Sequence, residues 1–232
     1  MDQPEIAYFD VGGRSIAYRL RRGKVPTLVF LPGYASDMEG TKALALDGFA
    51  KARGLSILRI DYSGTGSSGG RFEDGTLALW LEEALAAIDR LVEGPVILVG
   101  SSMGGWIALH LAILRPERVK ALVGIAAAPD FTSWGFPDGH AAVAEGIGRG
   151  FWESGQRLLL LGEPIGIYCP VRLLHGESDN EVPLDIALRL MRALRSSDVQ
   201  LTVLKGGGHR LSEPREIGAI LRAVEALLEP LS

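Results

Sequence analysis

The chain has 232 residues, 47% of them hydrophobic, and a formal net charge of −4 at pH 7. A chain of this length and apolar content can bury a complete core as a single domain. The chain carries a mild negative charge, and its lysines and arginines form no basic stripe. Both features argue against nucleic acid and against an anionic membrane surface as partners. No apolar run reaches the length of a transmembrane helix, so we expect no membrane span.

Two further features bear on the compartment in which the protein works. Cys169 is the only cysteine, so a disulfide within the chain is impossible, which fits a reducing compartment. The opening residues 1–5 are acidic and no apolar stretch follows them, so we expect no signal peptide. Together these features predict a cytoplasmic protein.

The order of the expected elements predicts the fold. Two alternating strands, 5–9 and 14–20, are joined by a short Gly-Gly link, which predicts an antiparallel hairpin. Apolar strands then alternate with helical patterns, as in a mostly parallel sheet with helices on both faces. The later strands are expected at 27–31, 55–60, 96–99, 119–125, 171–174 and 199–204, and the helices near 42–52, 77–92, 105–114, 183–195 and 214–228. These elements give eight strands in one domain spanning 1–232.

A glycine-rich motif follows the fourth expected strand. Residues 64–69 match the G-x-G-x-x-G pattern of dinucleotide-binding folds. That site needs a helix that begins at once and an acid near the end of the next strand, but residues 70–75 read as a loop. We therefore interpret the motif as a turn beside the mouth of the active site. Zinc-site and Walker patterns are absent too, so we expect no metal and no cofactor.

The motif that decides the function is Gly-Ser-Ser-Met-Gly at residues 100–104. It reads G-x-S-x-G and lies between an apolar run at 95–99 and an amphipathic helix pattern at 106–114. This context is that of the nucleophile elbow of serine hydrolases, where glycines permit a sharp turn that holds the central serine at the end of a strand. The predicted nucleophile is therefore Ser102.

A serine hydroxyl is a weak nucleophile, so a base and an orienting acid must accompany it. In hydrolases with this elbow the chain order is serine, acid, histidine. His209 suits the base best among the four histidines, because it lies on a loop between a late strand and a helix. The other three read as helical, loop or packed strand-end residues: His110, His140 and His175.

The acid should lie on a loop after a strand between Ser102 and His209. Asp179 fits, with room for one helix and one strand before the histidine. Glu177 and Glu181 are rivals in the same loop, and Asp130, after the previous strand, stays in reserve.

An oxyanion hole should complete the site. One backbone N–H is expected from Met103, the residue after the nucleophile, and the other from the loop after the third strand. That loop reads Leu-Pro-Gly-Tyr-Ala-Ser at 31–36, and the N–H of Tyr34 is the expected donor.

Residues 130–168 break the alternation of strands and helices, and the segment is too long for a simple crossover. We interpret it as a small lid inserted over the active site, in which Phe131, Trp134 and Phe136 bind substrate. The alternative is an ordinary crossover helix whose aromatic side chains pack on the sheet.

Several motifs together resemble one known family. They are Leu-Pro-Gly-Tyr at 31–34, residues 40–45, Asp-Tyr-Ser-Gly at 61–64, residues 100–106, residues 169–176, Asp179 and His209-Arg210. The joint pattern covers most of the chain and closely resembles the α/β-hydrolase subgroup that includes the animal mitochondrial palmitoyl-protein thioesterase, also described as a mycophenolic acid acyl-glucuronide esterase, and bacterial relatives. The resemblance implies the α/β-hydrolase fold and the same triad.

The expected function is that of a serine hydrolase that cleaves carboxylic esters or acyl thioesters through an acyl-enzyme on Ser102. Its substrate would be a small-molecule ester or an acylated thiol. The alternatives are a non-catalytic ligand-binding α/β-hydrolase, and a C–C hydrolase or perhydrolase with the same triad. The segment 130–168 looks shorter than the family's lid, which predicts a preference for short or medium acyl chains.

Overall fold

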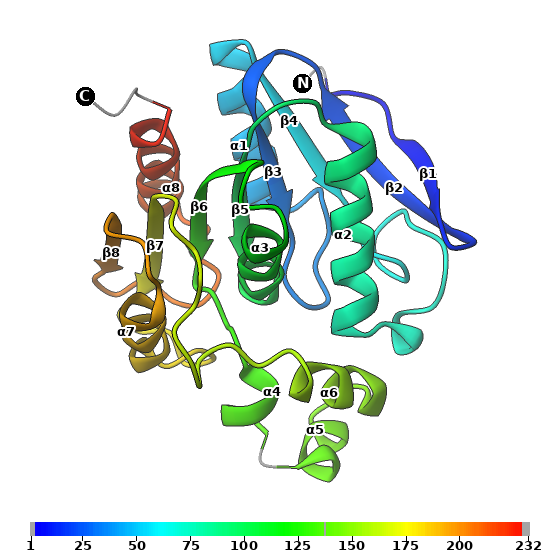
Figure 1. Cartoon of the computed structure of the whole chain (residues 1–232), viewed down its shortest axis with the longest axis vertical. Helices are drawn as coiled ribbons and strands as arrows, with labels where there is room; N and C mark the ends of the chain where they lie inside the picture. Colours follow the sequence, from blue (N-terminus) through cyan, green and yellow to red (C-terminus); the bar gives the residue numbers. More distant parts are fainter. Residues whose placement is uncertain (1–2, 137, 229–232) are drawn as a thin grey trace.

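The computed structural model describes residues 3–136 and 138–228 and is built on a central sheet of eight strands. The predicted absence of a signal peptide concerns residues 1–5, of which Met1 and Asp2 lie outside the described residues. The strand order is β1-β2-β4-β3-β5-β6-β7-β8 (Figure 1). β2 pairs antiparallel with both β1 and β4, whereas every other pair is parallel. The strands are β1 (Ala7–Val11), β2 (Arg14–Arg21), β3 (Lys24–Leu31), β4 (Leu55–Ile60), β5 (Val96–Ser101), β6 (Val119–Ile125), β7 (Val171–Gly176) and β8 (Val199–Leu204). The predicted sheet and its N-terminal hairpin are confirmed.

Helices cover both faces of this sheet (Figure 1). α1 (Thr41–Arg53) and α8 (Pro214–Ala226) share one apolar core with one face. α2 (Leu77–Leu91), α3 (Met103–Leu114) and α7 (Leu184–Ala193) contribute to the core on the other face. All five helices agree with the sequence prediction to within two residues at each end.

α3 is more deeply buried than its sequence pattern suggests. The pattern predicts an amphipathic helix, but every residue of the first two turns is buried. The reason is that α2 packs beside α3, and residues from the segment before β7 cover its outer side. There the carbonyl oxygen of Leu158 accepts a hydrogen bond from Trp106 Nε1 at 3.1 Å and lies 2.9 Å from His110 Nε2.

The segment between β6 and β7 forms three short helices beyond the carboxyl end of β6 (Figure 1). They are α4 (Phe131–Trp134), α5 (Gly139–Ala144) and α6 (Arg149–Gln156). α6 is held to α2 by the buried Phe151 and by Ser154, whose hydroxyl accepts the N–H of Ala78 at 2.9 Å. Asp130 joins the start of this segment to its later part, because its carboxylate accepts the N–H groups of Leu160 and Leu161 at 2.8 and 2.7 Å.

None of the helices in the described ranges combines the length and the apolar character needed to cross a bilayer.

Candidate active site

Ser102 lies at a sharp turn between β5 and α3. Its backbone angles, φ 52° and ψ −118°, are ones that residues with side chains rarely adopt, so strain is concentrated at this residue. Close backbone approach explains the flanking glycines. A Cβ on Gly104 would lie 2.1 Å from the carbonyl oxygen of Leu31, and one on Gly100 would lie 2.3 Å from that of Gly104. The elbow therefore forms as the motif predicts.

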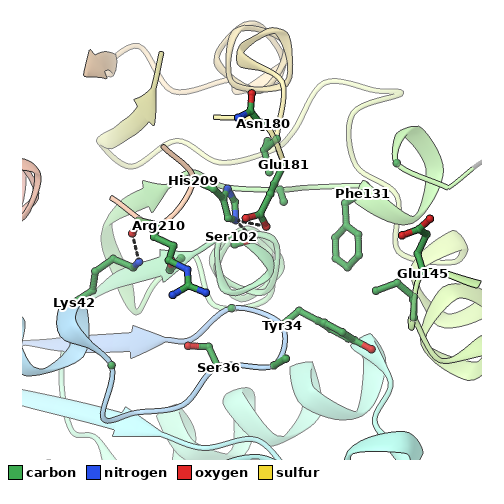
Figure 2. A pocket seen from close by; sticks show the side chains of 18 of the residues that line it. Tyr34, Ser36, Lys42, Ser102, Phe131, Glu145, Asn180, Glu181, His209 and Arg210 are labelled. Carbon is green, nitrogen blue, oxygen red and sulfur yellow. Dashed lines mark hydrogen bonds and ion pairs between the residues drawn. The ribbon is translucent and has the colours of Figure 1, made fainter. Parts of the chain in front are cut away.

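Three side chains from separate loops meet at this turn. His209 Nε2 lies 3.1 Å from Ser102 Oγ (Figure 2). On the other side of the ring, His209 Nδ1 lies 2.9 Å from Asp179 Oδ2. An ionised carboxylate only accepts hydrogen bonds, so Nδ1 of the neutral ring carries the proton and Nε2 is free to accept one. The site thus contains a continuous chain from the serine hydroxyl through the imidazole to the carboxylate.

The loops that carry Asp179 and His209 are locked together by their backbones. The N–H of Ser178 donates to the carbonyl oxygen of Gly207 at 2.9 Å. A Cβ on Gly176 would lie 2.3 Å from that same oxygen, so a larger residue would push the loops apart. This contact fixes the distance between the acid and the imidazole.

The carboxylate of Asp179 is fully buried and fully hydrogen-bonded. Its side chain is 0% exposed, and Oδ1 accepts the N–H groups of Glu181 and Val182, each at 2.9 Å. Burial by itself raises the pKa of Asp179, but the hydrogen bonds from His209 and from these two N–H groups outweigh burial, so the pKa is lowered. The carboxylate is therefore ionised at neutral pH.

The rival acids have other partners. The carboxylate of Asp130 is used by the two N–H groups at the base of the segment before β7. Glu177 accepts the N–H of Gly206 at 3.0 Å. Glu181 is 69% exposed and lies 3.7 Å from His209 Nε2, on the side of the imidazole that faces Ser102. Asp179 alone of these acids contacts Nδ1.

The remaining histidines lie outside this chain of hydrogen bonds. His110 is bound to the carbonyl oxygen of Leu158, and His140 is exposed on α5. His175 is 1% exposed, as expected for a packed residue at a strand end. Its Nε2 lies 2.9 Å from the carbonyl oxygen of Val182 and 3.5 Å from Asp179 Oδ2, so the ring packs against the carboxylate.

The loop after β3 lies directly beside the elbow. A Cβ on Gly33 would be 3.4 Å from Cβ of Ser102, so the backbone at Gly33 and Tyr34 passes next to the serine. Met103 is the first residue of α3, where N–H groups have no acceptor within the helix. Both expected oxyanion donors, the N–H groups of Tyr34 and Met103, thus belong to backbone that adjoins Ser102.

The side chain of Tyr34 packs among aromatic rings from other segments. Its ring centroid lies 5.0 Å from those of Phe72 and Phe151 and 6.3 Å from that of Phe131. The ring therefore joins the loop after β3 to the helices between β6 and β7.

A cavity of about 1,280 Å³ opens at Ser102. We call the apolar and aromatic part of its lining the apolar arm, which comprises Tyr34, Phe131, Trp134, Phe136, Ala141 and Ile147. We call the polar and charged part of its lining near His209 the polar arm, which comprises Ser36, Asp37, Lys42, Asn180, Glu181 and Arg210. Figure 2 shows Phe131 on one side of Ser102, and Lys42 and Arg210 on the other. All three aromatic residues predicted to bind substrate line the apolar arm.

The glycine-rich motif at 64–69 forms a turn, as predicted. None of its residues is among the described residues that line the cavity. The turn is instead bound to Asp61, to which the sequence assigned no role beyond its place in a family motif. Asp61 Oδ2 accepts the N–H of Ser67 at 2.8 Å, and Oδ1 accepts that of Met38 at 2.7 Å. A Cβ on Gly66 would lie 2.1 Å from Oδ2, which explains this glycine. Asp61 thereby supports the loop after β3.

Within the described part of the chain, no group of three or more His, Cys, Asp or Glu side chains is placed so that it could hold a metal ion.

Comparisons with known proteins bear on the family of the chain and on its fold. The family model described as the alpha/beta hydrolase fold matches residues 26–144. The human mitochondrial palmitoyl-protein thioesterase ABHD10 is 39% identical over 240 residues, which cover 94% of this chain and 78% of the human protein. The mouse alpha/beta hydrolase domain-containing protein 10 superposes with a TM-score of 0.91 at 36% identity, over 98% of this chain and 100% of that one. A solved structure from Agrobacterium vitis gives 0.90 at 40% identity, over 97% and 98%.

Proposed function

Because the chain belongs to the α/β-hydrolase family, and within it to the group of ABHD10, we propose that it hydrolyses acyl thioesters and carboxylic esters with Ser102, His209 and Asp179 as its catalytic residues. The enzyme is a serine hydrolase of esters or thioesters, similar to the palmitoyl-protein thioesterase ABHD10. The observation that carries the residue assignment is the hydrogen-bonded chain from Ser102 Oγ to the buried carboxylate of Asp179.

The first half of the reaction acylates the serine. His209 Nε2, 3.1 Å from Ser102 Oγ, takes the hydroxyl proton as the oxygen attacks the carbonyl carbon of the substrate. The same proton then passes to the leaving alcohol or thiol as its bond to the acyl carbon breaks. In the second half, water attacks the acyl-serine by the same route and releases the acid.

Asp179 has two tasks in this cycle. Its hydrogen bond to Nδ1 keeps Nε2 unprotonated and directed at Ser102, and its buried negative charge stabilises the imidazolium that forms. The two backbone N–H groups on Oδ1 hold the carboxylate in place while it does so.

The negative charge that develops on the carbonyl oxygen needs donors that are already in position. We assign this role to the N–H groups of Tyr34 and Met103, because the loop after β3 adjoins the elbow and α3 begins at Met103. Such a donor commonly contributes about 3 kcal/mol to transition-state stabilisation, since it requires no reorganisation during the reaction.

The apolar arm suits the acyl group. Phe131 and the aromatic residues around it supply apolar wall, and we propose that residues 130–168 act as the lid that encloses this arm. Figure 2 shows the carboxylate-bearing Glu145 on the far side of Phe131 from Ser102, so a long acyl chain would meet a charged group. These features support short or medium acyl chains.

Turnover tests this function directly. We expect the protein to hydrolyse p-nitrophenyl butyrate and an S-butyryl thioester, and Ser102→Ala to lower kcat by about 10⁴ to 10⁶. Ser101→Ala is the matched control and should retain much of the activity, because that hydroxyl lies outside the triad. Absence of turnover of both substrates by the wild-type protein would instead support a non-catalytic ligand-binding protein.

A further inference from the structure

The polar arm carries positive charge that the triad does not use. Lys42 is the second residue of α1, and Arg210 directly follows His209. Figure 2 shows both side chains beside Ser102, on the side away from Phe131, with the guanidinium of Arg210 between Ser102 and Ser36. The two cations therefore lie where the part of a substrate beyond the scissile bond would be, if the acyl chain takes the apolar arm.

Lys42 contacts the backbone of Arg210, so the two cations lie close together. Lys42 is half-buried, and its Nζ donates a hydrogen bond to the carbonyl oxygen of Arg210. Burial lowers the pKa of Lys42 and the charge of Arg210 lowers it further, while Glu216 opposes this shift only in part. In the ranges 3–136 and 138–228, no carboxylate lies within ion-pair distance of Lys42 or of Arg210. An anion placed between them would relieve their repulsion.

The two carboxylates of the polar arm have other contacts. Asp37 accepts the N–H of Glu39 at 2.8 Å. Glu181 is directed at the imidazole of His209, at 3.7 Å from Nε2, and its 69% exposure lets it move aside when substrate enters. Neither carboxylate neutralises Lys42 or Arg210, so the positive charge is available to a ligand.

We propose that Lys42 and Arg210 bind an anionic group, a carboxylate or a phosphate, on the leaving group of the substrate. This inference rests on the proposed function, because it requires acylation of Ser102 with the leaving group in the polar arm. The guanidinium can donate two parallel hydrogen bonds to a carboxylate or phosphate, and the ammonium adds a point charge. The leaving alcohol or thiol still departs with the proton from His209, so the anion takes no part in bond breaking.

Matched substrates isolate this contact. One pair is p-nitrophenyl butyrate and 3-carboxy-4-nitrophenyl butyrate, which differ by a carboxylate on the leaving group. The second pair is S-butyryl-N-acetylcysteamine and S-butyryl-coenzyme A, which differ by the phosphate-bearing part of the thiol. The quantity measured is the ratio of kcat/KM for the anionic member to that for the neutral member, and the two pairs separate a carboxylate ligand from a phosphate ligand.

Arg210→Gln should lower this ratio about tenfold or more in at least one pair, because a charge-assisted hydrogen bond is lost. Arg210→Lys, which keeps the charge, should restore part of the ratio. Arg222→Gln makes the same change in net charge on the exposed outer side of α8, away from the cavity lining, and should leave the ratio as in the wild type. Added salt should lower the wild-type ratio and have less effect on Arg210→Gln.

The proposal is overturned if Arg210→Gln and Lys42→Gln leave both ratios unchanged while the neutral substrates are still hydrolysed; the proposed function then stands without it. An equal loss in Arg222→Gln would also overturn it, because the effect would then reflect overall charge. If the wild-type protein hydrolyses none of the four substrates, the proposed function itself fails.

Discussion

Replacing Asp179 by asparagine should stop catalysis without unfolding the protein, and the contacts of this side chain explain why. Oδ1 must keep accepting the N–H groups of Glu181 and Val182, each at 2.9 Å. In the Asp179→Asn variant, the amide nitrogen of the new side chain would then occupy the place of Oδ2 and face His209 Nδ1 across 2.9 Å. Two donors cannot share one hydrogen bond, so the imidazole must move its proton to Nε2.

The cost of this tautomer change is large. With a proton on Nε2, His209 can no longer accept the hydroxyl proton of Ser102 from 3.1 Å away, and the imidazolium also loses its negative partner. A triad with an inverted imidazole typically loses about 10⁴ in kcat, equivalent to about 5.5 kcal/mol at 1.36 kcal/mol per tenfold change. The apparent affinity for substrate should change far less, because Asp179 does not line the cavity.

The assay is steady-state hydrolysis of p-nitrophenyl butyrate, with thermal unfolding measured on the same samples. Asp130→Asn is the matched control, since it also removes a buried carboxylate that accepts two backbone N–H groups. It should lower stability by about 1.5–3 kcal/mol, while its kcat stays well above that of Asp179→Asn. If Asp179→Asn leaves kcat almost unchanged while Asp130→Asn lowers it strongly, the catalytic acid lies after β6 and the reasoning is refuted.

Three further predictions concern the elbow, pH and the acyl chain. Gly104→Ala should cost about 10²-fold or more in kcat/KM, because its Cβ would meet backbone oxygen at 2.1 Å, whereas Gly48→Ala, with nothing within 4 Å, should keep its rate and gain about 0.5–1 kcal/mol of stability. Hydrogen bonding lowers the pKa of Asp179 in the folded protein, so its contribution to the free energy of unfolding should be complete above about pH 5 and decline below about pH 4, and Asp179→Asn should remove this dependence in acid unfolding curves. kcat/KM should gain up to about tenfold for each two methylenes and then level off at medium chain length, and a continuous rise from C2 to C16 esters would restore a long acyl groove.

The elbow and the triad could be predicted because the chemistry requires certain residue types at local positions. Gly100 and Gly104 are needed where a Cβ would overlap backbone atoms, so the motif itself carries the steric requirement. The order of serine, acid and histidine then leaves few loops for Asp179 and His209. Parallel strands all present their carboxyl ends on the same edge of the sheet, which is why residues so far apart in sequence meet there.

The features that escaped prediction depend on packing between distant segments. The outer side of α3 is covered by residues near Leu158, so the first two turns of an apparently amphipathic helix are buried on all sides. Asp61 supports the loop after β3 through the N–H of Met38, a contact that no local pattern encodes. Lys42 and Arg210 lie in different elements, and only the folded chain shows that both line the cavity beside Ser102.

Covalent labelling with a fluorophosphonate tests the central claim most directly, because the reagent modifies a serine only when a base has activated it. We expect one adduct per chain, mapped by peptide mass to Ser102. Ser102→Ala should remain unlabelled, His209→Ala should be labelled far more slowly, and Ser101→Ala should be labelled like the wild type. An adduct on Ser101, or an undiminished rate in His209→Ala, would contradict the assignment of Ser102 as a histidine-activated nucleophile.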